Sequence, residues 1–214
     1  ADLRRKVLAA YDGYQFRQAH LLLFDFCNDT LSATYLHAVK DRLYCDRADS
    51  PRRRSTQRAL WTISEVIIGL LAPILPHTAD EAWRALHGDD ASVHRTTFPE
   101  VSADADAGWD ALLLLRESVA KALEEAKERG IENPLDAGVT VPDGDGSLAP
   151  FLAELPDLFG VSRVHLDPTE STIVIHDLRD QPRCERSWRR DETVQQRADG
   201  GWLSDRDAEA VGLG

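Results

Sequence analysis

The sequence lacks the features that usually mark secreted, membrane or disulfide-rich proteins. Its 214 residues hold only three cysteines at wide spacing, which argues against a disulfide framework and favours a reducing compartment. No apolar run approaches the roughly 20 residues that span a bilayer. The N-terminus has no signal-peptide core, so we expect a cytoplasmic protein without a membrane partner. Methionine is absent and the first residue is Ala1, which indicates a part of a longer protein.

Familiar catalytic signatures are also missing. The sequence has no glycine-rich phosphate loop, no serine nucleophile elbow and no His-Glu-x-x-His metal helix. Its seven histidines are scattered, and none pairs with another at ligand spacing. The many carboxylates are most simply explained as solvated surface. We therefore expect no catalytic residue and no cofactor in this chain, which by itself is predicted to be inactive.

The net charge of −12 conceals an uneven distribution. Residues 1–60 hold 11 Lys/Arg against 7 Asp/Glu, whereas residues 61–214 hold 14 against 30. So acidic a chain does not associate freely with polyanions, but a local basic patch can still bind one. The first part of the chain is the place where such a patch is available.

Apolar residues recur at helical spacing through residues 1–98, which predicts an antiparallel helical bundle. Residues 28–30 are expected to end one helix and cap the next. Pro51 is expected to begin a long helix, which Pro73 and Pro76 must kink or end. A capping box that starts at Thr78 is expected to open the helix after it.

A small α+β domain is expected over residues 108–176, after a polar connection at 87–107. The period of the apolar residues changes there from helical to strand-like. The last stretch, 177–214, is charged, has few aliphatic residues and is expected to be weakly structured, without a core of its own. The fold class is therefore mainly α: a helical bundle, a small α+β domain and a charged tail. In the α+β domain, helices are expected at 109–129 and 148–159, and strands at 138–141, 161–166 and 172–176.

A basic segment joins two of the predicted helices, and we call residues 40–58 the basic elbow. Seven cations lie within these 19 residues, with Tyr44 among them. Arginine forks bind phosphates bidentately, and aromatic planes stack on unpaired bases. The simpler alternative is a solvated turn whose arginines pair with Asp41, Asp46 and Asp49. Composition alone leaves both interpretations open.

Several stretches resemble a known family. They include FCNDTLSATYLHAVKDRLYCD at residues 26–46, LLAPILPHTADEAW at residues 70–83 and LFGVSRV at residues 158–164. Together they resemble the anticodon-binding region of bacterial-type isoleucyl-tRNA synthetases. The KDRLY string at residues 40–44 is what points to the isoleucine enzymes over their valine, leucine and methionine relatives. The resemblance covers nearly the whole chain.

The resemblance implies a function in recognition rather than in chemistry. In the family, this region binds tRNA and positions it for ATP-dependent aminoacylation with isoleucine by an upstream catalytic domain. The H-I-G-H and K-M-S-K-S motifs of that domain are absent here. ATP and magnesium would belong to the catalytic domain. The expected partners are isoleucine tRNA and the rest of the synthetase in cis, in a monomeric protein.

The family's C-terminal zinc peptide is degenerate in this chain. The resemblance implies a C-x-x-C-W motif followed by a second C-x-x-C, but only Cys184 keeps its thiol. Ser187, Ser204 and Asp207 occupy the other three positions. One thiol and two serines cannot make the closed tetrahedral site of structural zinc. We therefore expect no zinc, and a tail that orders only against the bundle or the RNA.

Nine residues are the expected RNA contacts, and all but one are cationic. The cations are expected mainly at phosphates, although each could instead be a structural ion-pair partner. Trp188 is the candidate for base stacking, whereas Trp61 and Trp83 lie on apolar stripes and are expected in the core. Tyr35 and Tyr44 are likewise expected mainly to pack. The nine are Lys40, Arg42, Arg52, Arg53, Arg54, Arg58, Arg186, Trp188 and Arg189.

Two other functions remain open at this point. The chain could be a freestanding helical protein-interaction module that uses its acidic second half as the partner surface. It could also be a separate RNA-binding protein without a role in aminoacylation. The extent of the resemblance and the missing initiating methionine favour the synthetase fragment.

Overall fold

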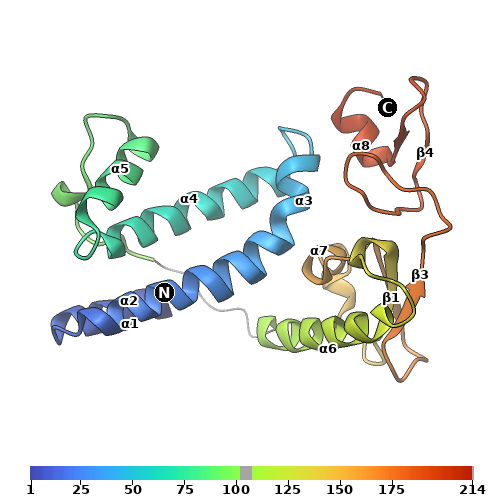
Figure 1. Cartoon of the computed structure of the whole chain (residues 1–214), viewed down its shortest axis with the longest axis horizontal. Helices are drawn as coiled ribbons and strands as arrows, with labels where there is room; N and C mark the ends of the chain where they lie inside the picture. Colours follow the sequence, from blue (N-terminus) through green and yellow to red (C-terminus); the bar gives the residue numbers. More distant parts are fainter. Residues whose placement is uncertain (102–107, 214) are drawn as a thin grey trace. The chain divides into compact units, whose positions relative to one another are not determined.

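The computed structural model describes residues 1–101 and 108–213, and it is mainly helical with two small sheets (Figure 1). The chain divides into two compact units. The first comprises Ala1–Leu36 and Ser55–Ala105, and the second His37–Arg54 and Asp106–Gly214. None of the described helices is long and apolar enough to cross a membrane. The expected fold class, mainly α with a small α+β part, is confirmed.

The first unit is built from packed helices. α1 (Asp2–Asp12) and α2 (Phe16–Asp25) pack against each other across a tight turn. The Tyr11 hydroxyl donates a hydrogen bond to the Leu70 carbonyl oxygen at 2.6 Å, which ties α1 to the end of α4. The other elements are η1 (Phe26–Leu36), most of α4 (Pro51–Leu71), α5 (Pro76–His87) and η2 (Val93–Arg95). The buried core residues are Val7, Ala10, Ala19, Leu23 and Leu70.

Two helix boundaries differ from those expected. α5 begins at Pro76 and no described side chain caps it, so the predicted capping box at Thr78 is wrong. Proline suits the first helical position because it has no N–H to satisfy and its φ is already helical. The predicted break at residues 28–30 is also wrong, because the chain continues there as the π-helical stretch η1. The wider π-type hydrogen-bond ring takes up extra residues without ending the helix.

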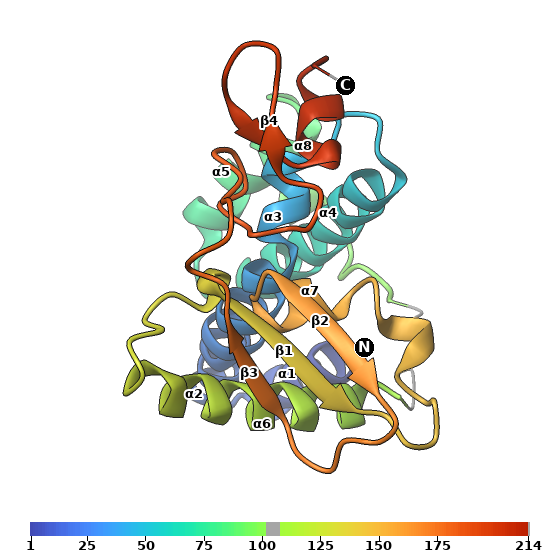
Figure 2. The ribbon, with the colours of Figure 1, turned by 90° about the vertical axis from the view of Figure 1, so that its right-hand side faces the viewer.

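The larger sheet of the second unit has the strand order β2-β1-β3 (Figure 2). β1 (Ala137–Pro142) pairs in parallel with β2 (Arg163–Asp167) and antiparallel with β3 (Val174–Asp177). α6 (Trp109–Lys127) places its buried leucine, valine and alanine side chains in the same core as the sheet. The three strands and this helix lie close to their predicted positions.

The second unit also contains α3 (His37–Cys45), the first turn of α4 and several short elements. The predicted helix at 148–159 is present only as two short pieces. Pro150 and Pro156 explain the interruption, because proline can begin a helix but cannot continue one. The short elements are η3 (Pro134–Asp136), η4 (Ala149–Phe151), α7 (Leu155–Phe159), β4 (Gln195–Gln196), β5 (Trp202–Leu203) and α8 (Asp205–Ala210).

The tail has a core of its own, so the expectation of a weakly structured segment is corrected. β4 pairs antiparallel with β5. Asp207 is fully buried beside the apolar cluster of the tail and contributes to its interior. The expectation failed because it counted aliphatic residues and left out a buried thiol and a buried carboxylate. The apolar cluster consists of Cys184, Val194, Leu203 and Ala208.

The compact units do not coincide with the predicted domains 1–98, 108–176 and 177–214. Residues 37–54 group with the α+β part and the tail, because α3 packs against α7. Helical periodicity is a local signal and carries no information about a contact with a segment more than a hundred residues later. The predicted polar connection at 87–107 lies partly outside the described residues.

Candidate nucleic-acid interface

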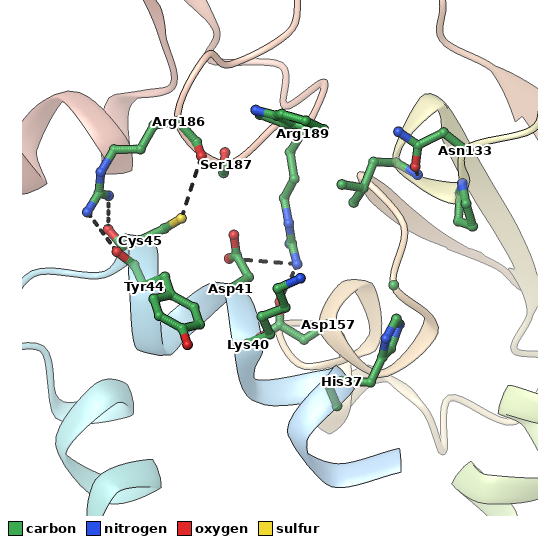
Figure 3. Close-up of a pocket in the computed structure, with 15 residues that line it drawn as sticks. His37, Lys40, Asp41, Tyr44, Cys45, Asn133, Asp157, Arg186, Ser187 and Arg189 are labelled. Atoms are coloured by element: carbon green, nitrogen blue, oxygen red, sulfur yellow. Dashed lines mark hydrogen bonds and ion pairs between the residues drawn. The ribbon is translucent and has the colours of Figure 1, made fainter. Parts of the chain in front are cut away.

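An open cavity of about 480 Å³ lies in the second unit beside α3 (Figure 3). Its lining comes from α3, the loop around η3, the end of α7 and the turn of residues 186–189. The cavity therefore brings one end of the basic elbow together with residues of the tail. Four of the nine predicted RNA contacts line it: Lys40, Arg186, Trp188 and Arg189.

Two exposed aromatic rings belong to this cavity. Tyr44, near the C-terminal end of α3, is 73% exposed, so its expected packing is wrong, and Trp188 is 55% exposed. Trp188 has a left-handed φ of 63°, which a residue with a side chain adopts only where its surroundings hold it. The guanidinium carbon of Arg183 lies 5.3 Å from the centre of the Trp188 ring. Exposed aromatic planes beside cations suit stacking on unpaired bases.

One wall of the cavity is built on the buried carboxylate of Asp157, in α7. Its Oδ2 accepts hydrogen bonds from Nη2 of Arg42 at 2.8 Å and from Nη2 of Arg52 at 2.7 Å. Its Oδ1 accepts a hydrogen bond from Arg189 (Figure 3). Glu154, one residue before α7, also accepts from Arg42. The basic elbow, α7 and the tail are therefore joined at one carboxylate.

These contacts give Arg42, Arg52 and Arg189 a structural role. A buried carboxylate needs cationic partners, because an unpaired charge in the interior is costly. The structure thus supports the alternative in which arginines of the elbow form ion pairs. Their shared partner is Asp157, and not the acidic residues of the elbow that the sequence suggested. That these three arginines also contact RNA stays a prediction.

The remaining cations of the elbow have different surroundings. Lys40 and Arg54 are exposed on α3 and α4. Arg53 is half-buried, and its Nη1 donates to the backbone carbonyl oxygen of Asp46 at 2.9 Å. Arg58 is exposed but belongs to the first compact unit. Lys40 and Arg54 are therefore the most exposed of the predicted phosphate contacts in the described part of the second unit, while Arg52 keeps 37% of its side chain accessible.

Two of the three acidic residues of the elbow pair mainly with the tail. Arg206 forms an ion pair with Asp41 and lies 3.5 Å from the Asp46 carboxylate. Asp49 is the exception, since it pairs with Arg47 at 3.0 Å within the elbow. The elbow is therefore only partly neutralised by its own carboxylates.

The four positions that the resemblance assigns to zinc lie together but do not fit a zinc ion. Asp207 Oδ2 accepts from Cys184 Sγ at 3.1 Å and from Ser204 Oγ at 2.9 Å. Arg186 and Arg206 also face this carboxylate, so two cations already occupy its surroundings. Zinc needs deprotonated ligands, whereas this thiol acts as a donor. Among residues 1–101 and 108–213, no three His, Cys, Asp or Glu side chains are grouped to hold a metal.

Two titratable groups that line the cavity, Cys45 and His37, have shifted pKa values. Burial raises the pKa of the Cys45 thiol to about 11, and the Asp41 and Asp207 charges add to this effect. Burial also lowers the pKa of His37, reinforced by the charges of Arg116 and Lys40. A nucleophilic thiol needs the opposite shift, and a neutral imidazole adds no positive charge to the cavity. Cys45 and His37 are therefore lining groups.

Sequence reasoning missed Asp157 and placed one tryptophan wrongly. A lone acidic residue in the otherwise apolar run of α7 was the available signal, because a buried carboxylate requires partners. Trp83 is buried, as predicted. Trp61 is 42% exposed, and its ring meets the His87 ring edge-on at 5.4 Å, so its predicted place in the core is wrong. The buried residues of α4 are Thr56, Gly69 and Leu70, so the apolar stripe around Trp61 is only partly covered.

Comparison with known proteins identifies a family and a set of relatives. Residues 1–139 match the family described as "Anticodon-binding domain of tRNA ligase". The isoleucine–tRNA ligase of Laribacter hongkongensis is 38% identical over 204 residues, which cover 90% of this chain and 21% of that protein. The isoleucine–tRNA ligase of Bacillus mycoides is 36% identical over 231 residues, 98% of this chain and 25% of that protein. The chain therefore spans about a quarter or less of these curated relatives.

The family match extends from α1 into β1 and includes the whole basic elbow. It covers more than half of the chain, and the relatives cover most of the remainder. The chain belongs to the family of anticodon-binding domains of tRNA ligases.

Proposed function

We propose that this chain binds tRNA at its anticodon region as part of an isoleucine–tRNA ligase. The observation that carries the proposal is the family match over residues 1–139. The cavity beside α3 supports it, because exposed aromatic rings and cations are the groups that RNA-binding proteins use on unpaired bases and phosphates.

In this role the chain positions the tRNA and leaves the chemistry to another domain. The complete ligase would join isoleucine to tRNA with ATP and magnesium in a catalytic domain outside this sequence. The proposed partners are isoleucine tRNA and the remainder of the ligase in cis, in a monomeric cytoplasmic protein. The chain itself is proposed to be catalytically inactive and to hold no cofactor.

The contacts are divided between two sets of residues. Lys40, Arg54 and Arg58 are proposed as phosphate contacts, because their side chains are exposed. Phosphate contacts position the RNA, whereas contacts to bases specify its sequence. Tyr44 and Trp188 are proposed to stack on anticodon bases, because their rings are exposed at the cavity.

A binding titration at fixed salt tests the proposal. Fluorescently labelled isoleucine tRNA and a non-cognate tRNA of similar length would be titrated with the whole chain, and anisotropy would be recorded. We expect tighter binding of the isoleucine tRNA, and affinity that falls as salt rises because phosphate contacts release counterions. Equal affinities for the two tRNAs would contradict specific recognition by this chain.

A further inference from the structure

We infer that a metal-free polar cluster centred on Asp207 orders the tail and takes the place of a structural metal ion. The cluster is formed by residues 184–187 and 204–207, two short motifs that lie far apart in the tail sequence. The inference concerns the folding of the tail, so it does not depend on the proposed binding of tRNA.

The centre of the cluster is the fully buried Asp207 side chain. Its Oδ2 receives the hydrogen bonds of Cys184 and Ser204, one from each motif. Ser204 also accepts from the Asp207 backbone N–H at 3.2 Å and so caps α8. The first turn of α8 is therefore tied to the turn that begins at Cys184.

Two guanidinium groups supply the positive charge that a bound metal ion would bring. Arg186 Nη1 lies 2.9 Å from Asp207 Oδ1, and Arg206 Nη2 lies 3.3 Å from Oδ2. Both arginines belong to the two motifs themselves. Two cations this close to the carboxylate repel a divalent ion, and the thiol proton would have to leave before the sulfur could bind one.

The carboxylate remains ionised in this setting. Burial alone raises the pKa of Asp207, but its polar surroundings lower it to about 2. The lowering comes from the Ser187 hydroxyl, the Arg206 charge and the hydrogen bonds of Cys184 and Ser204. The Ser187 hydroxyl lowers the Asp207 pKa, although its oxygen forms no hydrogen bond of ordinary geometry with the described residues. The cluster is thus a buried charge with partners on both of its oxygens.

The same two arginines fasten the cluster to α3. Arg186 donates to the carbonyl oxygens of Tyr44 and Cys45, at the C-terminal end of that helix (Figure 3). Cations are favourable there because the last carbonyl groups of a helix carry partial negative charge. Arg206 reaches Asp41 on the same helix. Loss of the Asp207 charge therefore removes a partner that the two arginines of these links share.

Hydrogen exchange of the whole chain, read by mass spectrometry, tests the inference with Asp207→Asn. The variant keeps the shape of the side chain but removes the negative charge that Arg186 and Arg206 share. We expect amide exchange over residues 184–190 and 203–208 to become at least about tenfold faster, because local opening requires less free energy. Peptides from α6 should exchange as in the wild type. Glu192→Gln is the matched control, since its carboxylate is 80% exposed and pairs with Arg163 only at 3.4 Å.

A metal measurement on the wild-type chain completes the test. We expect far less than one equivalent of zinc after purification, and no change in tail exchange after treatment with EDTA. If Asp207→Asn loses its helical circular dichroism, Arg206→Gln replaces it, and the same loss of tail protection is expected. If the tail of the folded variant exchanges its amide hydrogens as slowly as the wild-type tail, the inference is overturned. One equivalent of bound zinc whose removal accelerates tail exchange would also overturn it.

Discussion

At the scale of single residues, Asp157 holds a position that no other described carboxylate shares. It is 3% exposed and receives three arginines, from α3, from the start of α4 and from the tail. Each arginine on its own is a surface type, but the shared carboxylate withdraws all three from solvent to some degree. The arrangement gives the basic elbow a structural role beside the RNA-binding role proposed for it.

Replacement of Asp157 by Asn should destabilise the chain more than any exposed acid-to-amide change. The substitution leaves three guanidinium groups facing a neutral amide, and loss of one partner from a buried ion pair costs about 3–5 kcal/mol. Urea unfolding followed by circular dichroism measures the change. Asp177→Asn serves as the control, because that carboxylate pairs with Arg179 at the surface. A similar unfolding midpoint for both variants would argue against the structural role of Asp157.

Lys40 and Arg42 lie two residues apart on α3, but their replacement by alanine should affect different properties. Lys40→Ala should affect tRNA binding, and Arg42→Ala should affect stability. Lys40→Ala should weaken tRNA binding and lower the salt slope by about 0.7–1, the value for one phosphate contact, while the urea midpoint stays unchanged. Arg42→Ala should lower the midpoint, because its side chain bonds Asp157 and Glu154. Lys121→Ala, an exposed change on α6 outside the cavity, is the control. If Lys40→Ala binds like this control, Lys40 is not a phosphate contact.

At the scale of elements, α7 and α3 meet at a glycine. Gly160 ends α7 with a left-handed φ of 70°, and a Cβ at this position would lie 2.8 Å from His37 Nε2. A residue with a side chain therefore meets two penalties here, one from its backbone conformation and one from the neighbouring ring. The close approach of the two helices depends on the absence of a side chain.

Gly160→Ala should destabilise the chain by at least about 1–2 kcal/mol, the cost of left-handed backbone for an L-residue. In the Gly160→Ala variant, the further change His37→Ala should remove the steric part of the destabilisation but leave the part that comes from the backbone conformation. A double-mutant cycle from urea unfolding separates the two, because coupled neighbours deviate from additivity. Strict additivity would show that the histidine ring moves aside without cost.

The tail should protect its cysteine from reagents. Cys184 is fully buried and Cys27 is half-buried in the first unit. Iodoacetamide at pH 8 should therefore label Cys27 well before Cys184. Cys45 should also react slowly, because a thiol whose pKa is about 11 has about one thousandth of its population as thiolate at pH 8. Mass spectrometry of tryptic peptides reads all three rates, and rapid labelling of Cys184 would contradict the packed tail.

The elements of this chain differ in how well the sequence predicts them. Helix α6 and the three strands of the larger sheet follow from local periodicity, and their predicted positions are close to the observed ones. Both Pro76 and Thr78 were possible starts for α5. The helix begins at Pro76, because the fixed φ of proline suits the first helical position. The Asp157 and Asp207 clusters include hydrogen bonds between residues 115 and 21 positions apart, respectively. No periodicity or composition measure contains such long-range contacts.

At the scale of the whole chain, the uneven charge favours a restricted contact with RNA. The acidic residues 61–214 repel a polyanion, so productive approach is expected through the basic elbow and the cations near it. The same elbow lies within the part of the chain that matches the anticodon-binding family. The charge distribution and the family match therefore favour the same region of the sequence for the proposed RNA contact.

Ribonuclease footprinting of isoleucine tRNA by the whole chain tests the central claim most directly. End-labelled tRNA would be digested with and without the protein, and protection would be mapped nucleotide by nucleotide. An anticodon-binding function predicts protection of the anticodon loop and adjoining stem, with the acceptor end cleaved as in free tRNA. Protection confined to the acceptor end, or equal weak protection along the whole tRNA, would contradict it.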